Sequence, residues 1–463
     1  MITKKLAQLV LNECLSTGAD FSEIFLEDTT TFSLSCDNGV IETVSSTQIK
    51  GAGIRLIKDL KSVYGNTNIL TKKGLLDLSS SLKDSFYGDR IKYCAPLKKV
   101  RIKRKHLPKI SYINYSKEDM VKLLKEASEA MKIDERIVRT VCGLTYTIQN
   151  VEIFNSDGKL VTDTRIRGRM SLMAVARDEK GIETFGENPG ASKGMEFLLD
   201  ENNILEMAKN CAKTALVMLD AKECPSGKMP VVIGNGFGGV IFHEACGHSL
   251  EATSVAKDLS VFSNMLGKQI ASSVVSAVDD GTIDGGWGSG NVDDEGNPCT
   301  RNLLIKNGIL TSYMVDPFND RRMNVGQTGC SRRQSYKYEP TSRMTNTFIL
   351  PGNNTVEEII SSVKKGLYAK SLGGGSVNPA TGEFNFSANE AYMIEDGKIT
   401  YPVKGATLIG SGKEVLMKID MVASDLKRAQ GMCGSQSGSL PVDVGQPTIR
   451  VSEMTVGGRG GKL

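Results

Sequence analysis

The N-terminal half of the chain alternates between segments with a helical hydrophobic period and segments with a strand period. Apolar residues recur every three or four positions from Leu6 to Cys14, which predicts an amphipathic helix over residues 2–17. Two-residue alternation on both sides of the turn signal Asn38-Gly39 predicts a β-hairpin. The same criteria predict strands at 21–27, 31–36, 40–46, 53–57, 62–66 and within 138–185, and helices at 72–82, 117–131 and 202–219.

The C-terminal half is patterned mainly as short strands separated by glycine turns such as Asn307-Gly308 and Asp396-Gly397. Its predicted strands lie at 229–233, 273–279, 303–306, 309–315, 384–386, 391–394 and 398–403, and its predicted helices are one near 240–250 and one at 355–362. We therefore predict an α+β protein with an N-terminal domain, residues 1–224, that combines an antiparallel sheet with helices. A β-rich, barrel- or sandwich-like C-terminal domain, residues 225–463, is predicted to follow.

Composition narrows the class of protein. The 463 residues carry a net charge of only +4, which gives no reason to expect nucleic acid as a partner. The chain contains no run of 18 apolar residues, so we expect no membrane span. The N-terminus lacks the continuous apolar core of a signal peptide. Ten cysteines without C-x-x-C pairs indicate a reducing compartment, so we predict a cytoplasmic protein.

The most informative motif is His243-Glu244-Ala-Cys-Gly-His248, which contains two of the three histidines in the chain. Two imidazoles can bind zinc, and a neighbouring carboxylate such as Glu244 can take a proton from water. The common zinc motif spaces its histidines by four residues, whereas five residues of regular helix rotate the second by roughly 140°. Both histidines reach one metal only if the helix is overwound, bulged or ending, and Gly247 makes such a deviation cheap.

A catalytic zinc site needs a third protein ligand. The candidates from the residues alone are Glu251 and Asp258, which follow soon after, and distant cysteines such as Cys433 in a small-residue turn. Cys246, inside the motif, is interpreted as a core residue or as a residue that packs behind the ligands. The choice among these ligands stays open on this evidence.

Other polar segments are interpreted as structural or left open. The acidic stretch 291–296 lacks the ligand spacing of a calcium loop and is interpreted as a solvated turn. The glycine-rich stretch 234–239 lacks a phosphate-loop ending and is interpreted as a tight turn. The stretches that contain Tyr336, Arg343 and Asn346 could contact a peptide backbone or form structural hydrogen bonds.

Nearly the whole chain resembles the TldD/PmbA family of metallopeptidases, and within it the TldD type. The resemblance rests on the stretch 238–252 around the histidine motif and on five further stretches, 293–296, 343–347, 364–368, 401–410 and 445–448. It implies that His243, His248 and Cys433 are zinc ligands and that Glu244 is the catalytic base. It also implies pairing with a TldE/PmbA-type paralogue that lacks the zinc motif, although a homodimer is equally compatible with the sequence.

The sequence therefore predicts a zinc-dependent hydrolase of short or unfolded peptides, in which zinc and Glu244 together activate water. The alternative is a non-catalytic regulatory or binding protein whose zinc is structural. The carboxylate beside His243 favours the hydrolase, because a structural zinc site does not need a base.

Overall fold

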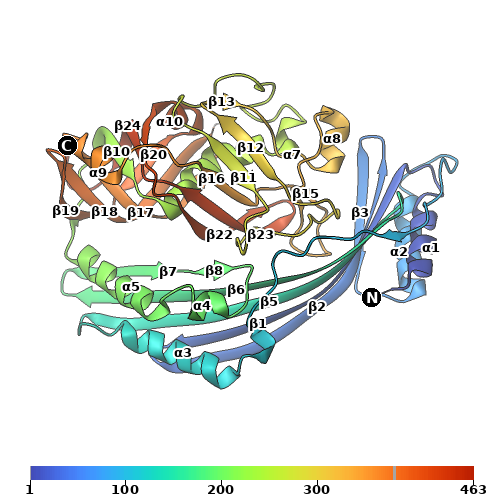
Figure 1. The fold of residues 1–463 in the computed structure, drawn as a ribbon, viewed down its shortest axis with the longest axis horizontal. Coiled ribbons are helices and arrows are strands. Elements are labelled where there is room, and N and C mark those ends of the chain that lie inside the picture. The colour runs from blue at the N-terminus through green and yellow to red at the C-terminus, as the bar shows by residue number, and fades with distance from the viewer. Residues whose placement is uncertain (1, 379–381, 463) are drawn as a thin grey trace.

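A long, curved antiparallel sheet forms the N-terminal part of the protein. The computed structural model describes residues 2–378 and 382–462 (Figure 1). The sheet has the order β3-β2-β1-β5-β6-β4, and two further strands, β7 and β8, also pair with β6. Its strands are β1 (Phe21–Asp37), β2 (Val40–Lys58), β3 (Lys61–Thr67), β4 (Lys98–Lys99), β5 (Ile137–Asn155), β6 (Lys159–Asp178), β7 (Gly181–Glu187) and β8 (Gly190–Ala191).

The long strands are more continuous than their hydrophobic pattern indicates. The ranges 21–27 and 31–36 were predicted as separate strands, but both lie in β1, which continues through Asp28, Thr29 and Thr30. This polar stretch stays extended because β1 pairs with β2 on one side and with β5 on the other along nearly its whole length. Ladder hydrogen bonds on both edges outweigh the local break in the pattern.

Helices cover only one face of this sheet (Figure 1). The helices α1 (Lys4–Cys14) and α2 (Lys72–Lys83) pack on one end of the sheet, against apolar residues such as Ile24 and Ile54. The middle of the sheet packs against α3 (Lys117–Ala130), α4 (Glu196–Leu199) and α5 (Ile204–Leu219). Strand side chains alternate between faces, so the hydroxyl-rich residues between the apolar ones point away from these helices.

The C-terminal part lies over this opposite, concave face of the sheet (Figure 1). Strand β17 pairs with both β10 and β18, so five strands, β17-β10-β24-β20-β18, close into a ring. A second sheet has the order β13-β12-β11-β16-β23-β22, with β22 at its edge. The first sheet contains β9 (Lys222–Glu223), β10 (Gly227–Ile233), β17 (Lys365–Val377), β18 (Glu383–Glu395), β19 (Lys398–Lys404), β20 (Thr407–Ser411), β21 (Ile419–Val422) and β24 (Ile449–Gly457).

The second sheet and the remaining elements complete this part. The sheet contains β11 (Ala277–Asp280), β12 (Arg301–Lys306), β13 (Ile309–Leu310), β16 (Asn346–Ile349), β22 (Lys427–Ser435) and β23 (Gly438–Gln446). A separate pair is β14 (Ser331–Arg332) with β15 (Thr341–Ser342). The short helices are α6 (Val240–Phe242), α7 (Ala252–Val255), α8 (Pro317–Met323), α9 (Val356–Ser361) and α10 (Gly412–Lys418).

The histidine-bearing helix is buried in the largest hydrophobic core, which is shared by the two C-terminal sheets. Phe242, Ala245 and Cys246 all belong to this core, which confirms that Cys246 is a core residue. The predicted α+β class is confirmed, with a sheet-and-helix part followed by a β-rich part that includes a closed strand ring.

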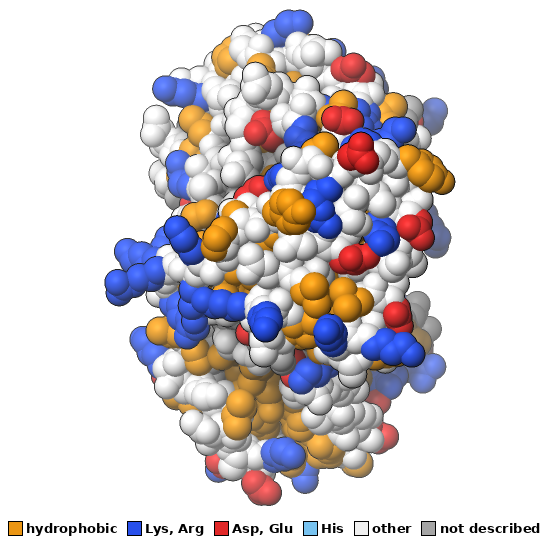
Figure 2. Space-filling view, turned by 90° about the vertical axis from the view of Figure 1, so that its right-hand side faces the viewer, with side chains coloured by type: hydrophobic (Ala, Val, Ile, Leu, Met, Phe, Trp, Pro, Cys, Tyr) orange, Lys and Arg blue, Asp and Glu red, His pale blue; other side chains and the backbone are white. Residues whose placement is uncertain are grey.

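The surface carries no single-sign face at the end formed by α1 and α2, where basic, acidic and hydrophobic side chains are interspersed (Figure 2). In the described part of the chain, no helix is both long enough and apolar enough to cross a membrane.

Candidate metal centre

A π-helical turn brings the two histidines of the motif to the same side of the helix. After α6, residues His243–Gly247 form a π-helical segment, and the His248 N–H donates to the carbonyl oxygen of His243, five residues earlier. In this wider turn, residues five apart lie one above the other, as residues four apart do in an α-helix. The deviation that the spacing required is therefore a bulge, not an overwound turn.

Gly247 matters in this turn because it has no side chain, not because of its backbone conformation. Its φ and ψ of −52° and −54° are ordinary helical values, so the predicted conformational role of this glycine is wrong. A Cβ at this position would lie 2.2 Å from the Met344 Sδ atom. Any larger residue at this position would have to displace the buried Met344 side chain.

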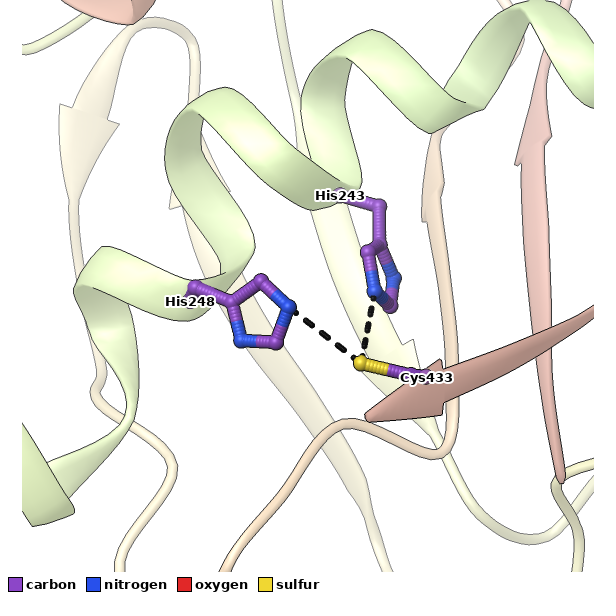
Figure 3. Close-up of side chains that lie close together, drawn as sticks. All are labelled: His243, His248 and Cys433. Carbon is purple, nitrogen blue, oxygen red and sulfur yellow. Dashed lines mark hydrogen bonds between the residues drawn. The ribbon is translucent and has the colours of Figure 1, made fainter. Parts of the chain in front are cut away.

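Cys433 reaches the two histidines from the edge strand β22 (Figure 3). Its Sγ atom lies 3.2 Å from Nε2 of His243 and 3.2 Å from Nε2 of His248. The neighbouring Met432 side chain is 50% exposed and Cys433 is buried, as the alternation of a strand requires. The ligand atoms of all three residues lie within 4.8 Å of one another.

These three donors fit a zinc ion. Zinc–nitrogen and zinc–sulfur bonds of about 2.1 and 2.3 Å at tetrahedral angles place nitrogen and sulfur about 3.6 Å apart. The observed 3.2 Å separations are close to this value. Burial, with smaller contributions from His248 and Arg343, lowers the pKa of His243 well below its ordinary value. His243 is therefore neutral, the form that binds a metal.

Glu251 orients His248 and does not face the three donor atoms. Its Oε2 lies 3.2 Å from His248 Nδ1, which leaves the other ring nitrogen for Cys433. Its Oε1 accepts from the Met344 N–H at 3.2 Å and lies 3.7 Å from Arg343 Nε. Burial alone would lower the pKa of His248, but Glu251 and Cys433 raise it well above its ordinary value. A carboxylate on the outer nitrogen is the usual support of a metal-binding histidine.

Asp258, the other nearby candidate ligand, lies outside this cluster. It is exposed, and its Oδ1 accepts from the Asn264 side chain at 3.0 Å. Among the candidates from the sequence, the fold thus brings together His243, His248 and Cys433 and leaves Asp258 apart.

Glu244 lies beside the three donors and remains open to solvent. Its Oε2 is 3.7 Å from His248 Nε2, and its side chain is 28% exposed. Partial burial raises the pKa of Glu244 above its ordinary value. A carboxylate with a raised pKa, held next to a metal site and reachable by water, is suited to exchange protons at neutral pH.

Arg343 holds the turn that presents Cys433. Its Nη2 donates to the Cys433 carbonyl oxygen at 2.6 Å, and its Nη1 donates to Ser437 Oγ at 2.9 Å and to the Gly438 carbonyl at 3.0 Å. The sequence identifies Arg343 as a polar residue, but its role depends on a hydrogen bond to Cys433, which lies 90 positions further along the chain. Arg343 is thus a support of the site and not a ligand.

Tyr336 and Asn346 belong to structural networks. The Tyr336 N–H donates to Glu27 Oε2 at 2.7 Å, which joins the two parts of the protein. The Asn346 side chain accepts from the Gly288 N–H at 2.9 Å and donates to Ser289 Oγ at 2.8 Å.

The sequence matches three domains of the PmbA/TldA metallopeptidases: domain 1 at residues 22–84, the central domain at 111–219 and the C-terminal domain at 226–458. Similar chains are named metalloprotease TldD homolog in Haemophilus influenzae (36% identity, covering 95% of this chain and 93% of the relative) and in Buchnera aphidicola subsp. Schizaphis graminum (35%, covering 97% and 95%).

Solved structures share the fold at lower identity. One, from Thermotoga maritima, is named as a modulator of DNA gyrase and superposes with a TM-score of 0.78 at 24% identity, covering 94% of this chain and 96% of that one. TldE from Thermococcus kodakarensis superposes with a TM-score of 0.75 at 19% identity, covering 98% and 100%. With family domains matched along most of its length and relatives above 30% identity over nearly all of it, the chain belongs to the PmbA/TldD family of metallopeptidases.

Proposed function

We propose that this protein is a zinc-dependent peptide hydrolase, with zinc held by His243, His248 and Cys433 and with Glu244 as the general base. The observation that carries the proposal is the convergence of two imidazoles and a thiol within 4.8 Å, with a carboxylate beside them. A relative in Saccharolobus solfataricus, 28% identical over 66% of this chain, is named a zinc metalloprotease TldD homolog, which supports zinc as the metal.

Zinc and the surrounding side chains would have separate roles in the reaction. When bound, zinc supplies a Lewis acid that polarises a peptide carbonyl and makes water more acidic. Glu244 takes the proton from the attacking water and returns one to the leaving amine. Glu251 and Arg343 keep His248 and Cys433 in place during this exchange.

The substrate class follows from access to the site. His243 is 2% and Cys433 is 6% exposed, and the site lies where the helix meets an edge strand. A flexible segment can reach such a site with its backbone, whereas a folded surface cannot. Short or unfolded peptides are therefore the proposed substrates.

Removal of the metal tests this function. We expect a chelator to abolish cleavage of a flexible fluorogenic peptide and added zinc to restore it, because the ligand set without metal offers no Lewis acid. Thiol alkylation of the zinc-loaded protein should have little effect, since zinc protects Cys433. Cleavage that survives chelation and is lost on alkylation would instead identify a cysteine nucleophile.

We also infer a dimer, formed with a TldE/PmbA-type paralogue or with a second copy of this chain. The supporting observation is the free edge of β2, where residues 42–50 are exposed and, in the described chain, pair with β1 alone. A long exposed strand edge offers unpaired N–H and C=O groups on which a strand of another chain can pair. A TldE protein shares the fold, and all ten thiols are free, as a reducing cytoplasm would require.

Substitution of Val44 tests this interface. Val44 is 57% exposed on β2, and Val44→Lys places on this edge a charge of the kind that disfavours edge-to-edge pairing. We measure the mass in solution for this chain alone and for its mixture with the paralogue. In whichever sample the unsubstituted protein forms a dimer, we expect the substitution to shift the mass toward that of the monomer. The matched control is Ile182→Lys, at an exposed apolar residue of β7 (54% exposed). An unchanged mass for Val44→Lys would exclude this strand from the interface.

A further inference from the structure

A pocket with an arginine-rich wall lies between the two parts of the protein. Its volume is about 330 Å³, and it is bounded by the concave face of the N-terminal sheet and by residues 439–441 of β23. Four arginines line it: Arg165 and Arg167 from β6, and Arg332 and Arg333 from the segment around β14.

Two of these arginines have no acidic partner. Arg165 pairs with Asp294 and Arg333 pairs with Glu23, whereas Arg167 and Arg332 form no ion pair with any described residue. Arg167 donates from Nε to the Trp287 carbonyl at 3.1 Å and from Nη2 to the Ser289 carbonyl at 3.3 Å. Its Nη1 has no hydrogen-bond partner in the described chain and stays available to a ligand.

The acidic groups of the wall are already engaged. Asp294 accepts from Arg165 and from the Arg333 N–H at 2.6 Å. Asp293 Oδ1 accepts from two backbone N–H groups, and Glu27 accepts from Gln149 Nε2 at 2.9 Å. The acidic segment predicted to be a solvated turn is in fact buried here, because arginines from the sheet neutralise it.

The electrostatics of Arg167 agree with this geometry. Burial, together with the charges of Arg332 and Arg165, lowers the pKa of Arg167 to about 9. Burial removes water from the guanidinium and the two neighbouring arginines repel its charge, and a bound anion would offset both effects.

The pocket connects directly to the metal centre. Arg332 donates from Nη1 to the Met344 carbonyl at 2.5 Å and from Nη2 to the Pro441 carbonyl at 2.7 Å. The Met344 N–H donates to Glu251, which holds His248. Pro441 is the cross-strand neighbour of Met432, which also lines the pocket and precedes Cys433. The β22–β23 ribbon therefore contributes to the pocket through Met432 and Pro441 and to the metal centre through Cys433.

We propose that this pocket, with Arg167 and Arg332 as its recognition groups, binds a carboxylate of the peptide substrate. The identification of the ligand as a peptide rests on the proposed peptidase function. The free Nη1 of Arg167 can donate a charge-assisted hydrogen bond to a carboxylate, the Arg332 charge adds to the attraction, and the volume suits one residue of a peptide. The carboxylate comes either from the peptide C-terminus or from an acidic side chain.

Direct binding tests the proposal without any turnover. The probes are acetyl-tetraalanine with a free C-terminal carboxylate, its C-terminal amide, and two amidated peptides that differ only by Glu in place of Gln. Titration calorimetry is run on the full-length Glu244→Gln protein so that no probe is cleaved. We expect at least one carboxylate probe to bind roughly tenfold tighter than its neutral counterpart, as a charge-assisted hydrogen bond provides. The probe that shows the preference identifies the source of the carboxylate.

Variants of Arg167 separate recognition from structure. Arg167→Gln should remove the preference for the carboxylate, and Arg167→Lys should retain part of it, since lysine keeps the charge but cannot also make the two hydrogen bonds that hold the Arg167 guanidinium in place. The matched control is Arg169→Gln, on the same strand, because Arg169 stacks near the Trp287 ring but does not line the pocket. Equal affinities for charged and neutral probes, or an equal loss in the Arg169 variant, would overturn the proposal. Because the readout is binding, either result stands whether or not the protein cleaves peptides.

Discussion

Glu244→Gln is expected to lower the rate of peptide cleavage by about 10²–10⁴-fold, the usual contribution of a general base. Glutamine has the same shape as glutamate but cannot take a proton from water. Glu244 is not among the three converging donors, and its side chain is 28% exposed, so zinc content and thermal stability should stay unchanged. The measurement is kcat for a flexible peptide, together with zinc per chain on the same preparation.

This variant also decides between the two functional hypotheses. A regulatory protein with a structural zinc would not need Glu244, and solved structures that share the fold are named as modulators of DNA gyrase. The matched control is Glu206→Gln, a glutamate on the exposed side of α5, which should leave kcat unchanged. Full activity of Glu244→Gln with zinc bound would falsify the assignment of the base and favour the regulatory hypothesis.

Cys433→Ser is expected to reduce bound zinc from near one ion per chain to a small fraction of that. The variant leaves two histidines and a poorly matched hydroxyl, while catalytic zinc sites require three good ligands. Ligands that bind only the folded state stabilise it, by about 4 kcal/mol when their concentration exceeds Kd by a thousandfold. We therefore expect zinc to raise the melting temperature of the wild type and to leave that of Cys433→Ser nearly unchanged.

Cys246→Ala provides the control for this experiment. Cys246 lies in the same π turn, but its side chain is buried in the core and faces away from the cluster as a packing residue. We expect this variant to lose some stability through the small cavity and to keep its zinc. Equal zinc in the wild type and in Cys433→Ser would remove Cys433 as a ligand. Glu251 would then have to turn from His248 Nδ1, 3.2 Å away, toward the metal to serve as the third ligand.

The local sequence pattern predicted part of the set of metal-binding residues but not all of it. Residue types and spacing were enough to select His243, Glu244 and His248, because a histidine-poor chain makes such a motif conspicuous. The same spacing left the helix overwound, bulged or ending, and only the folded chain shows that it widens into a π-helical bulge. Spacing alone also left three candidates for the third ligand. Only the resemblance to a known family selected Cys433, which the fold brings next to the histidines.

Amphipathic helices and turns were determined by the sequence itself, because their signals lie within a few residues. Helices α2 and α3 and the hairpin at Asn38-Gly39 occur where the pattern predicts them. The continuity of β1, the burial of the acidic segment at 293–296 and the supporting roles of Glu251 and Arg343 were decided by the tertiary structure. Each depends on partners far away in the chain, such as β5 for β1 and the sheet arginines for Asp294. The free energy of these long-range pairings outweighs local preference, and only the folded chain makes them.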